Sequence, residues 1–238
     1  MRDGVIIALD FPNKDTTDAF LSRFPANGLY VKVGMELFFQ TGPRLIDDLK
    51  ARGCRIFMDL KLHDIPNTVK RTMKGLASLD IEMVNVHAAG GRPMMEAALE
   101  GLDQGTAAGE NRPLCVAVTQ LTSTSQEMME NDLLINGTME KVVASYAKLA
   151  QTAGLDGVVC SPLEAQVIKL TCGSRFLTVT PGIRPSDHMA ADDQVRVATP
   201  GRARQLGSDY IVVGRSITEA GEPVKAYEQI QAEWSEMK

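Results

Sequence analysis

The segment DLKLHDIPNT, residues 59–68, places charged side chains at a spacing that could do chemistry. If its first residues lie in a β-strand, alternation puts Asp59 and Lys61 on one face, with Asp64 just beyond. An ammonium group between two carboxylates is held protonated, because nearby negative charge favours the cation. Such a lysine suits proton donation better than Schiff-base chemistry, which needs a neutral amine. The alternative is an ion-pair network with a structural role only.

A second group of residues could bind an anion. Gly214 and Arg215 follow the apolar run at 210–213. Arg184 ends the apolar run before it, and Gln194 lies further along the same loop. Two arginines and exposed backbone N–H groups on neighbouring strands favour a phosphate site. The alternative is a Gly-rich turn with solvated arginines.

Polar residues also lie at the ends of other apolar runs. They are Asp10, Lys32, His87, Thr122 and Ser123. Charges at the ends of several strands are informative, because a buried charge has to be paired or functional. Lys32 could orient Asp59 or bind a substrate. The alternative is a lysine whose stem packs at the rim while its ammonium group reaches water.

The histidines and aspartates allow a metal site only on paper. The candidate ligands are His63, His87 and His188, with Asp59 or Asp64. Alternation along the strand turns His63 outward, and Lys61 would stand where a metal cation would bind. We therefore expect no metal site.

The elements that must position these residues follow one pattern. Short apolar, β-branched runs recur about 20–40 residues apart and end in polar or Gly-containing residues. The eight runs are 5–10, 29–34, 55–61, 82–91, 114–123, 156–162, 176–184 and 210–216. The segments between them read as amphipathic helices, with stripes such as Leu45, Ile46 and Leu49. Eight βα units in 238 residues predict an α/β fold, a (β/α)₈ TIM barrel, as a single domain over residues 1–238.

A doubly wound sheet is the alternative fold. It would usually carry a G-x-G-x-x-G turn after the first strand, whereas residues 10–14 contain no glycine. A barrel places catalytic residues at the carboxyl ends of its strands, which fits the charged ends of the runs. Two long segments, 121–138 and 181–200, are predicted to be lids or binding loops at that end.

The composition limits the class of protein. A net charge of −5 argues against general binding to nucleic acids or anionic membranes. No stretch approaches the roughly 18–20 apolar residues of a membrane span. The four cysteines form no C-x-x-C pair and are expected to be buried thiols in a reducing compartment. We expect a cytoplasmic globular protein.

At these residues the chain resembles the orotidine 5′-phosphate decarboxylase family. The most specific string is D-x-K-x-x-D-I-P-N-T at 59–68. The other matching strings fall in order: ALD at 8–10, KVG at 32–34, NVHAAGG at 85–91, VTQLTS at 118–123, TPGIR at 180–184, DQ at 193–194 and VGRSI at 213–217. The resemblance extends from about residue 5 to residue 218.

The resemblance implies decarboxylation of orotidine 5′-phosphate to uridine 5′-phosphate (UMP) and CO₂, the last step of de novo UMP synthesis. It implies a homodimer that needs no metal or cofactor. Lys61 would donate a proton to C6 within a charged array of Lys32, Asp59, Lys61 and Asp64. Asp64, with Ile65 and Thr68, would reach the site of the partner subunit. The other implied substrate contacts are Asp10 and Lys32 at the ribose, Thr122 with its neighbour Ser123 at the pyrimidine edge, and Arg184, Gln194, Gly214 and Arg215 at the phosphate.

Two other functions fit part of the pattern. Related sugar-phosphate decarboxylases and aldolases share the D-x-K-x-x-D core but use Mg²⁺, held in part by a Glu on the second strand. This chain has Lys32 in that region, and a lysine repels a metal cation. A non-catalytic nucleotide-binding barrel would keep Arg184 and Arg215 but has no need for Lys61.

Overall fold

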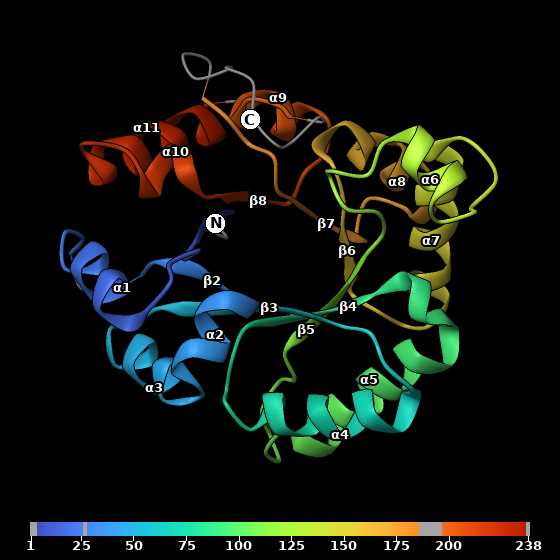
Figure 1. Ribbon diagram of the computed structural model, residues 1–238, viewed down its shortest axis with the longest axis horizontal. Coiled ribbons are helices and arrows are strands. Elements are labelled where there is room, and N and C mark those ends of the chain that lie inside the picture. Colours follow the sequence, from blue (N-terminus) through green and yellow to red (C-terminus); the bar gives the residue numbers. More distant parts are fainter. Residues whose placement is uncertain (1–3, 26–27, 186–196, 237–238) are drawn as a thin grey trace.

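The computed structural model describes residues 4–25, 28–185 and 197–236. Within these ranges, eight parallel strands close into a barrel in chain order (Figure 1). The strands are β1 Val5–Ala8, β2 Tyr30–Gly34, β3 Arg55–Leu62, β4 Met83–His87, β5 Leu114–Val118, β6 Gly157–Val159, β7 Leu177–Thr180 and β8 Tyr210–Val213. Each strand falls inside its predicted run, except that β3 extends one residue beyond the run at 55–61. The prediction of a (β/α)₈ barrel is confirmed, and the doubly wound alternative is wrong.

Helices surround the barrel and connect its strands (Figure 1). They are α1 Lys14–Leu21, α2 Met35–Thr41, α3 Arg44–Ala51, α4 Pro66–Ala77, α5 Gly91–Gly105, α6 Gln126–Asn131, α7 Met139–Thr152, α8 Ala165–Cys172, α9 Pro200–Gln205, α10 Arg215–Thr218 and α11 Pro223–Ser235, with the 3₁₀ turns η1 Ala88–Gly90 and η2 Pro162–Glu164. The described helices include none that is long and apolar enough to cross a membrane.

The strands separate two apolar layers because their side chains alternate between the faces of the sheet. The inner layer fills the barrel with residues such as Tyr30, Phe57 and Met83. The outer layer packs strands against helices, as Ile56 and Met58 do on either side of Phe57. The inner layer closes the barrel below the carboxyl ends of the strands. Polar residues further along the strands therefore lie directly above this apolar layer.

Local sequence signals explain where several elements begin and end. A capping box begins η2, because the Ser161 side chain accepts from the backbone N–H of Leu163 while Glu164 accepts from the N–H of Ser161. Gly53, Gly154 and Gly207 adopt positive φ ahead of β3, β6 and β8, as expected for helix ends. The predicted apolar stripe of Leu45, Ile46 and Leu49 is buried in α3, and Val69, Met73 and Leu76 form a similar buried stripe in α4.

Helices α4 and α5 approach each other closely because two glycines leave room. A Cβ atom added at Gly101 would overlap the backbone carbonyl of Lys70, and one at Gly105 would overlap that of Lys74. An ion pair between Lys70 and Glu100 joins the same two helices. Any side chain at Gly101 would therefore push the two helices apart.

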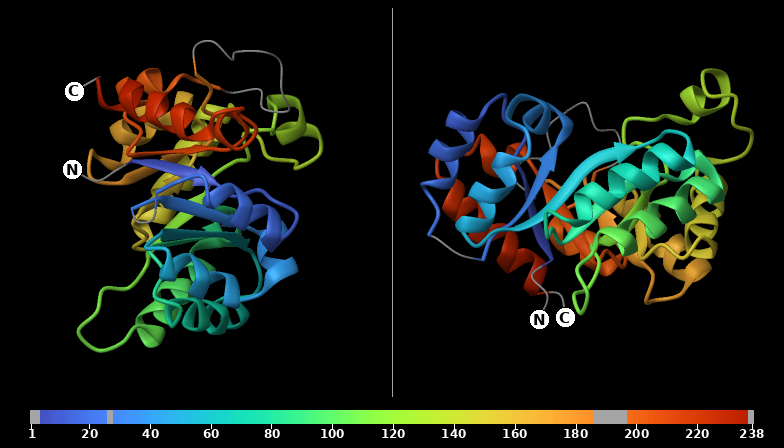
Figure 2. Two further views of the ribbon diagram at one scale, coloured as in Figure 1. Left: turned by 90° about the vertical axis from the view of Figure 1, so that its left-hand side faces the viewer. Right: turned by 90° about the horizontal axis from the view of Figure 1, so that it is seen from below.

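The structure describes the whole of one predicted long segment, 121–138, and only part of the other, 181–200. Segment 121–138 contains α6 and stands out from the body of the molecule (Figure 2). Residues 186–196 of segment 181–200 lie outside the described residues, and with them Gln194 and His188.

The four cysteines are free, as predicted, although only Cys115 and Cys160 are fully buried. Burial raises the pKa of the Cys115 thiol to about 12. A thiol in that environment is not an active nucleophile.

Candidate active site

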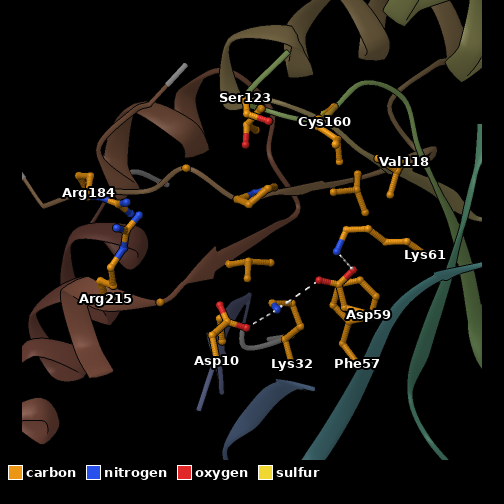
Figure 3. Close-up of a pocket in the computed structure, with 18 of the residues that line it drawn as sticks. Asp10, Lys32, Phe57, Asp59, Lys61, Val118, Ser123, Cys160, Arg184 and Arg215 are labelled. Carbon is orange, nitrogen blue, oxygen red and sulfur yellow. Dashed lines mark hydrogen bonds and ion pairs between the residues drawn. The ribbon is translucent and has the colours of Figure 1, made fainter. Parts of the chain in front are cut away.

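A cavity of about 470 Å³ opens at the carboxyl end of the barrel (Figure 3). That volume lies within the range of pockets that enclose small-molecule ligands. The predicted residues that line it are Asp10, Lys32, Asp59, Lys61, Thr122, Ser123, Arg184, Gly214 and Arg215. Residues from six strand ends, far apart in the sequence, therefore meet in one place.

Lys32 joins two carboxylates at the floor of this cavity. Its Nζ lies 2.9 Å from Asp10 Oδ1 and 3.2 Å from Asp59 Oδ2. Burial alone would lower the pKa of Lys32, but Asp59 and Asp10 outweigh that effect and hold the pKa above its ordinary value. Lys32 is thus a buried, fully charged cation and not a lysine extended to the rim.

Lys61 forms the second ion pair of Asp59. Its Nζ donates to Asp59 Oδ1 at 2.7 Å, and both side chains point into the cavity (Figure 3). Simple alternation does not explain this geometry, because the pairing of β3 with β4 shifts between Met58 and Leu62. Lys61 has φ of 50°, a left-handed conformation that is uncommon outside glycine. The irregular backbone of β3 is therefore what places the ammonium group beside Asp59.

Asn85 of the adjacent strand β4 is hydrogen-bonded to both members of the same pair. Its Nδ2 donates to Asp59 Oδ1 at 2.6 Å, and its Oδ1 accepts from the backbone N–H of Lys61 at 2.7 Å. The residue is 1% exposed. The three inward positions that carry Lys32, Asp59 and Asn85 each lie two residues beyond an inner-layer aromatic or methionine.

The charge state of Asp59 follows from these contacts. Burial alone would raise the pKa of its carboxyl group, but Lys32 and Lys61, with hydrogen bonds from Lys61 and Asn85, outweigh burial. The pKa consequently lies below its ordinary value. The floor of the cavity holds an ionised carboxylate between two ammonium groups, with donors directed at both oxygens.

Two arginines lie at the other end of the cavity. Arg184 follows β7 and is buried, whereas Arg215 begins α10 and is exposed. Their guanidinium groups point toward one another, away from Lys61 (Figure 3). Gly214 lines the cavity beside Arg215, and a Cβ there would make only ordinary contacts, 3.6 Å from Ala8 and 3.8 Å from Asp10. Two cations at one end suit a phosphate group.

The wall between the two ends combines polar and apolar groups. Thr122 and Ser123 face the cavity from the loop after β5. Beside Lys61 the wall is apolar, formed by residues that include Val118, Val159 and Cys160. A planar ring with polar edges would therefore meet hydrogen-bonding groups on one side and a dry surface near the ammonium group.

Three predicted residues lie outside this cavity. Asp64 and Ile65 are exposed beyond β3, and Thr68 lies in the first turn of α4. The Asp64 carboxylate accepts from the backbone N–H of Ile65 at 2.7 Å. The prediction that Lys61 lies between two carboxylates is therefore not met within one chain, where its ion pair is with Asp59.

The histidines do not assemble a metal centre in the described part of the chain. The rings of His63 and His87 lie 5.6 Å apart, and neither residue lines the cavity. Burial, with nearby His63 and Lys61, lowers the pKa of His87. Among the described residues, no cluster of three or more His, Cys, Asp or Glu side chains is placed to hold a metal ion.

Sequence reasoning missed Asn85 and the wall residues Gln120 and Cys160. Alternation along β4 was a usable signal, because Met83 and Asn85 share the inward face while Val84 and Val86 face the helices. Gln120 offered a weaker one, since it is a polar residue two positions beyond the end of β5.

The chain is similar to known proteins of one family. Residues 3–230 match the model of the family described as "Orotidine 5'-phosphate decarboxylase / HUMPS family". The chain is 59% identical over 235 residues to a protein of Bacillus cereus (strain AH820) named "Orotidine 5'-phosphate decarboxylase", covering 98% of each chain. A protein of the same name from Bacillus cytotoxicus is also 59% identical, with the same coverage.

Two crystal structures resemble the fold closely. The structure of orotidine 5'-phosphate decarboxylase from Lactobacillus acidophilus is 45% identical, with a TM-score of 0.87, over 97% of this chain and 98% of that one. An uncharacterized conserved protein from Geobacillus kaustophilus is 53% identical, with the same TM-score, over 97% of this chain and 100% of its own.

Proposed function

The chain belongs to the orotidine 5′-phosphate decarboxylase / HUMPS family, and from that premise we propose which residues carry out its reaction. The protein is a carboxy-lyase of UMP synthesis, which converts orotidine 5′-phosphate to UMP and CO₂. The observation that supports our assignment of roles is the ion-paired Lys61–Asp59–Lys32 floor of a cavity whose other end holds Arg184 and Arg215.

Lys61 is the proton donor. When the bond between C6 and the carboxylate carbon breaks, CO₂ leaves and the electron pair stays on C6. The Lys61 N–H bond then gives its proton to C6, which forms UMP and leaves a neutral amine. A fixed ammonium group stabilises the charge as it develops, and the apolar wall beside it excludes water that would screen it.

Asp59 and Lys32 hold that ammonium group in place. Asp59 bonds Lys61 directly, and Lys32 fixes the second oxygen of Asp59. Asp59 also lies beside the substrate carboxylate, whose negative charge disappears from the site when CO₂ forms. The contribution of the array is therefore greatest during bond breaking and not during binding.

The remaining residues bind the nucleotide. Arg184, Gln194, Gly214 and Arg215 hold the phosphate, Asp10 and Lys32 meet the ribose, and Thr122 with Ser123 faces the pyrimidine edge. The cavity extends from Lys61 to the arginines, which supports one ligand reaching both ends. Binding energy from the phosphate can then order the charged array and raise the rate as well as the affinity.

The protein acts as a homodimer in which Asp64, Ile65 and Thr68 complete the site of the partner subunit. Two features support this proposal. Asp64 follows the carboxyl end of β3, a strand whose Asp59 and Lys61 line the cavity, but does not line it itself. Ile65 is 67% exposed, and Phe39, from the neighbouring β2–α2 unit, is 76% exposed. Burial of these two apolar side chains in a dimer would favour its formation.

The enzyme is cytoplasmic, forms one domain over residues 1–238 and needs no metal or cofactor. The charged floor supports the last point, because Lys32 stands where a metal-dependent relative would place a carboxylate. The test is an ultraviolet assay of orotidine 5′-phosphate decarboxylation with and without EDTA. We expect equal rates, whereas loss with EDTA and rescue by Mg²⁺ would favour the magnesium-dependent branch. Binding of UMP with no decarboxylation under either condition would favour the alternative of a non-catalytic nucleotide-binding barrel.

A further inference from the structure

We propose that Asn85 is a positioning residue for decarboxylation, which sets both the backbone of Lys61 and the carboxylate of Asp59. This inference rests on the proposed roles of Lys61 and Asp59. It starts from the irregular pairing between β3 and β4. β3 advances four positions, from Met58 to Leu62, while β4 advances two, from Val84 to Val86. Asn85 is thus the single β4 residue opposite the bulged segment of β3.

The bulge explains why a side chain is needed at this point. Extra residues in one strand interrupt the ladder of backbone hydrogen bonds and leave backbone groups without their regular partners. Lys61 lies in that segment with φ of 50°, a conformation that costs energy in a non-glycine residue. The Asn85 Oδ1 accepts from the Lys61 N–H at 2.7 Å and so supports the strained conformation.

The amide nitrogen of Asn85 acts on the partner of Lys61. Nδ2 donates to Asp59 Oδ1 at 2.6 Å, the same oxygen that receives Lys61 Nζ. One neutral side chain therefore fixes the backbone of Lys61 and the carboxylate of Asp59. Because Asn85 is 1% exposed, water does not compete for these hydrogen bonds. A neutral amide can do this without changing the net charge of the array.

The chemistry of the residue is specific to this task. A donor and an acceptor on one short side chain are required, since Asp59 only accepts and the Lys61 N–H only donates. A carboxylate would repel Asp59, and an alanine would leave both partners unsatisfied in a buried place. Asn85 does not line the cavity, so it has no direct contact with the substrate.

The test compares Asn85→Ala and Asn85→Asp with a matched control. Thr178→Ala also removes a buried polar side chain from a strand, but its bonds are to Gly207 and Asp209 at the opposite end of the barrel. For each variant we would measure kcat, the melting temperature, and Kd for two probes. The probes are UMP and a UMP analogue with an anionic oxygen at C6, which imitates the charge that develops there.

We expect both Asn85 variants to lower kcat about 10- to 100-fold, and to weaken the C6-oxyanion probe by a similar factor, because buried bonds to a charged group are lost. UMP affinity should stay within about threefold, because its phosphate end is untouched. Thr178→Ala should lower only the melting temperature.

Three outcomes would overturn the inference. The first is a kcat near the wild-type value in Asn85→Ala. The second is normal turnover in Asn85→Asp, which would mean that only the volume of the side chain matters. The third is equal loss of affinity for both probes, which would indicate general damage to the cavity. Lys61→Ala, assayed in parallel, separates these outcomes from a failure of the proposed function, because it alone tests the proton donor.

Discussion

Lys61 reaches Asp59, two residues before it on the same strand, from a left-handed backbone position, with Nζ and Oδ1 2.7 Å apart. In a regular strand both side chains would point inward, but the spacing of the two residues along the strand would separate the Lys61 ammonium group from the Asp59 carboxylate. The bulge in β3 brings the two charges into direct contact at the cavity floor. This contact makes the role of each residue open to separate tests.

Lys61→Ala should remove most turnover. The ammonium group matters chiefly as charge develops at C6, and general acid catalysis is worth about 100- to 10,000-fold in rate. UMP binding should change little, because the arginines that we propose to hold its phosphate are unchanged. The measurement is kcat for orotidine 5′-phosphate with Kd for UMP by calorimetry. If the variant keeps more than about a tenth of wild-type kcat, Lys61 is not the proton donor.

Arg215→Ala should weaken catalysis on the phosphorylated substrate only. Losing a charge-assisted contact to a dianion should lower kcat/KM for orotidine 5′-phosphate about 10- to 150-fold, or about 1.5–3 kcal/mol. Activity on the nucleoside orotidine, which lacks the phosphate, should scarcely change. Equal losses on both substrates would show that Arg215 supports the fold instead.

The barrel and the charged strand ends were predictable because they depend on short-range patterns. Alternation and helical periodicity located all eight strands, and with them the level at which Asp10, Lys32 and Arg184 emerge. Asn85 was not predictable as a contact of Lys61, because that contact depends on the β3–β4 register. The proposed role of Asp64 depends in the same way on a second chain, since its side chain lies outside the cavity of its own subunit.

Acid should remove a stabilising contribution of Asp59. Its pKa is lower in the folded protein than in the unfolded chain, so the folded state favours the ionised carboxylate. That contribution is complete above the unfolded value of about 3.9 and disappears as the pH falls through the lower folded value. Asn in place of Asp59 imitates the neutral form.

The wild type should therefore lose free energy of unfolding relative to Asp59→Asn as the pH falls. Urea denaturation of both proteins between pH 7 and the lowest pH at which both refold would measure it, with Asp80→Asn, an exposed aspartate, as the control. A difference that stays constant with pH would contradict the depressed pKa.

Alanine should have opposite effects at two glycines of the same helix pair. Gly101→Ala forces a Cβ into the backbone of Lys70, so we expect a loss of about 1–3 kcal/mol in stability. Gly75→Ala in α4 meets nothing within 4 Å, and should stabilise the helix by about 0.5–1 kcal/mol. Thermal and urea denaturation would measure both changes, and a Gly101→Ala variant as stable as the wild type would show that α4 and α5 can separate to admit the Cβ.

Mixing two inactive variants should restore activity if the subunits share their sites. Asp64 is exposed and outside its own cavity, while Lys61 lines that cavity. In a mixed dimer of Lys61→Ala and Asp64→Asn, a two-fold axis would bring both defects into one site and leave the other intact. Co-refolded protein should then have a kcat well above that of either parent.

A mixture of Lys61→Ala and Lys32→Ala is the control. Each of these defects stays within the site of its own subunit, so no activity should return. Native mass spectrometry would verify that mixed dimers formed. Mixed dimers without regained activity would place Asp64 in the site of its own subunit, and a purely monomeric protein would reject the shared site altogether.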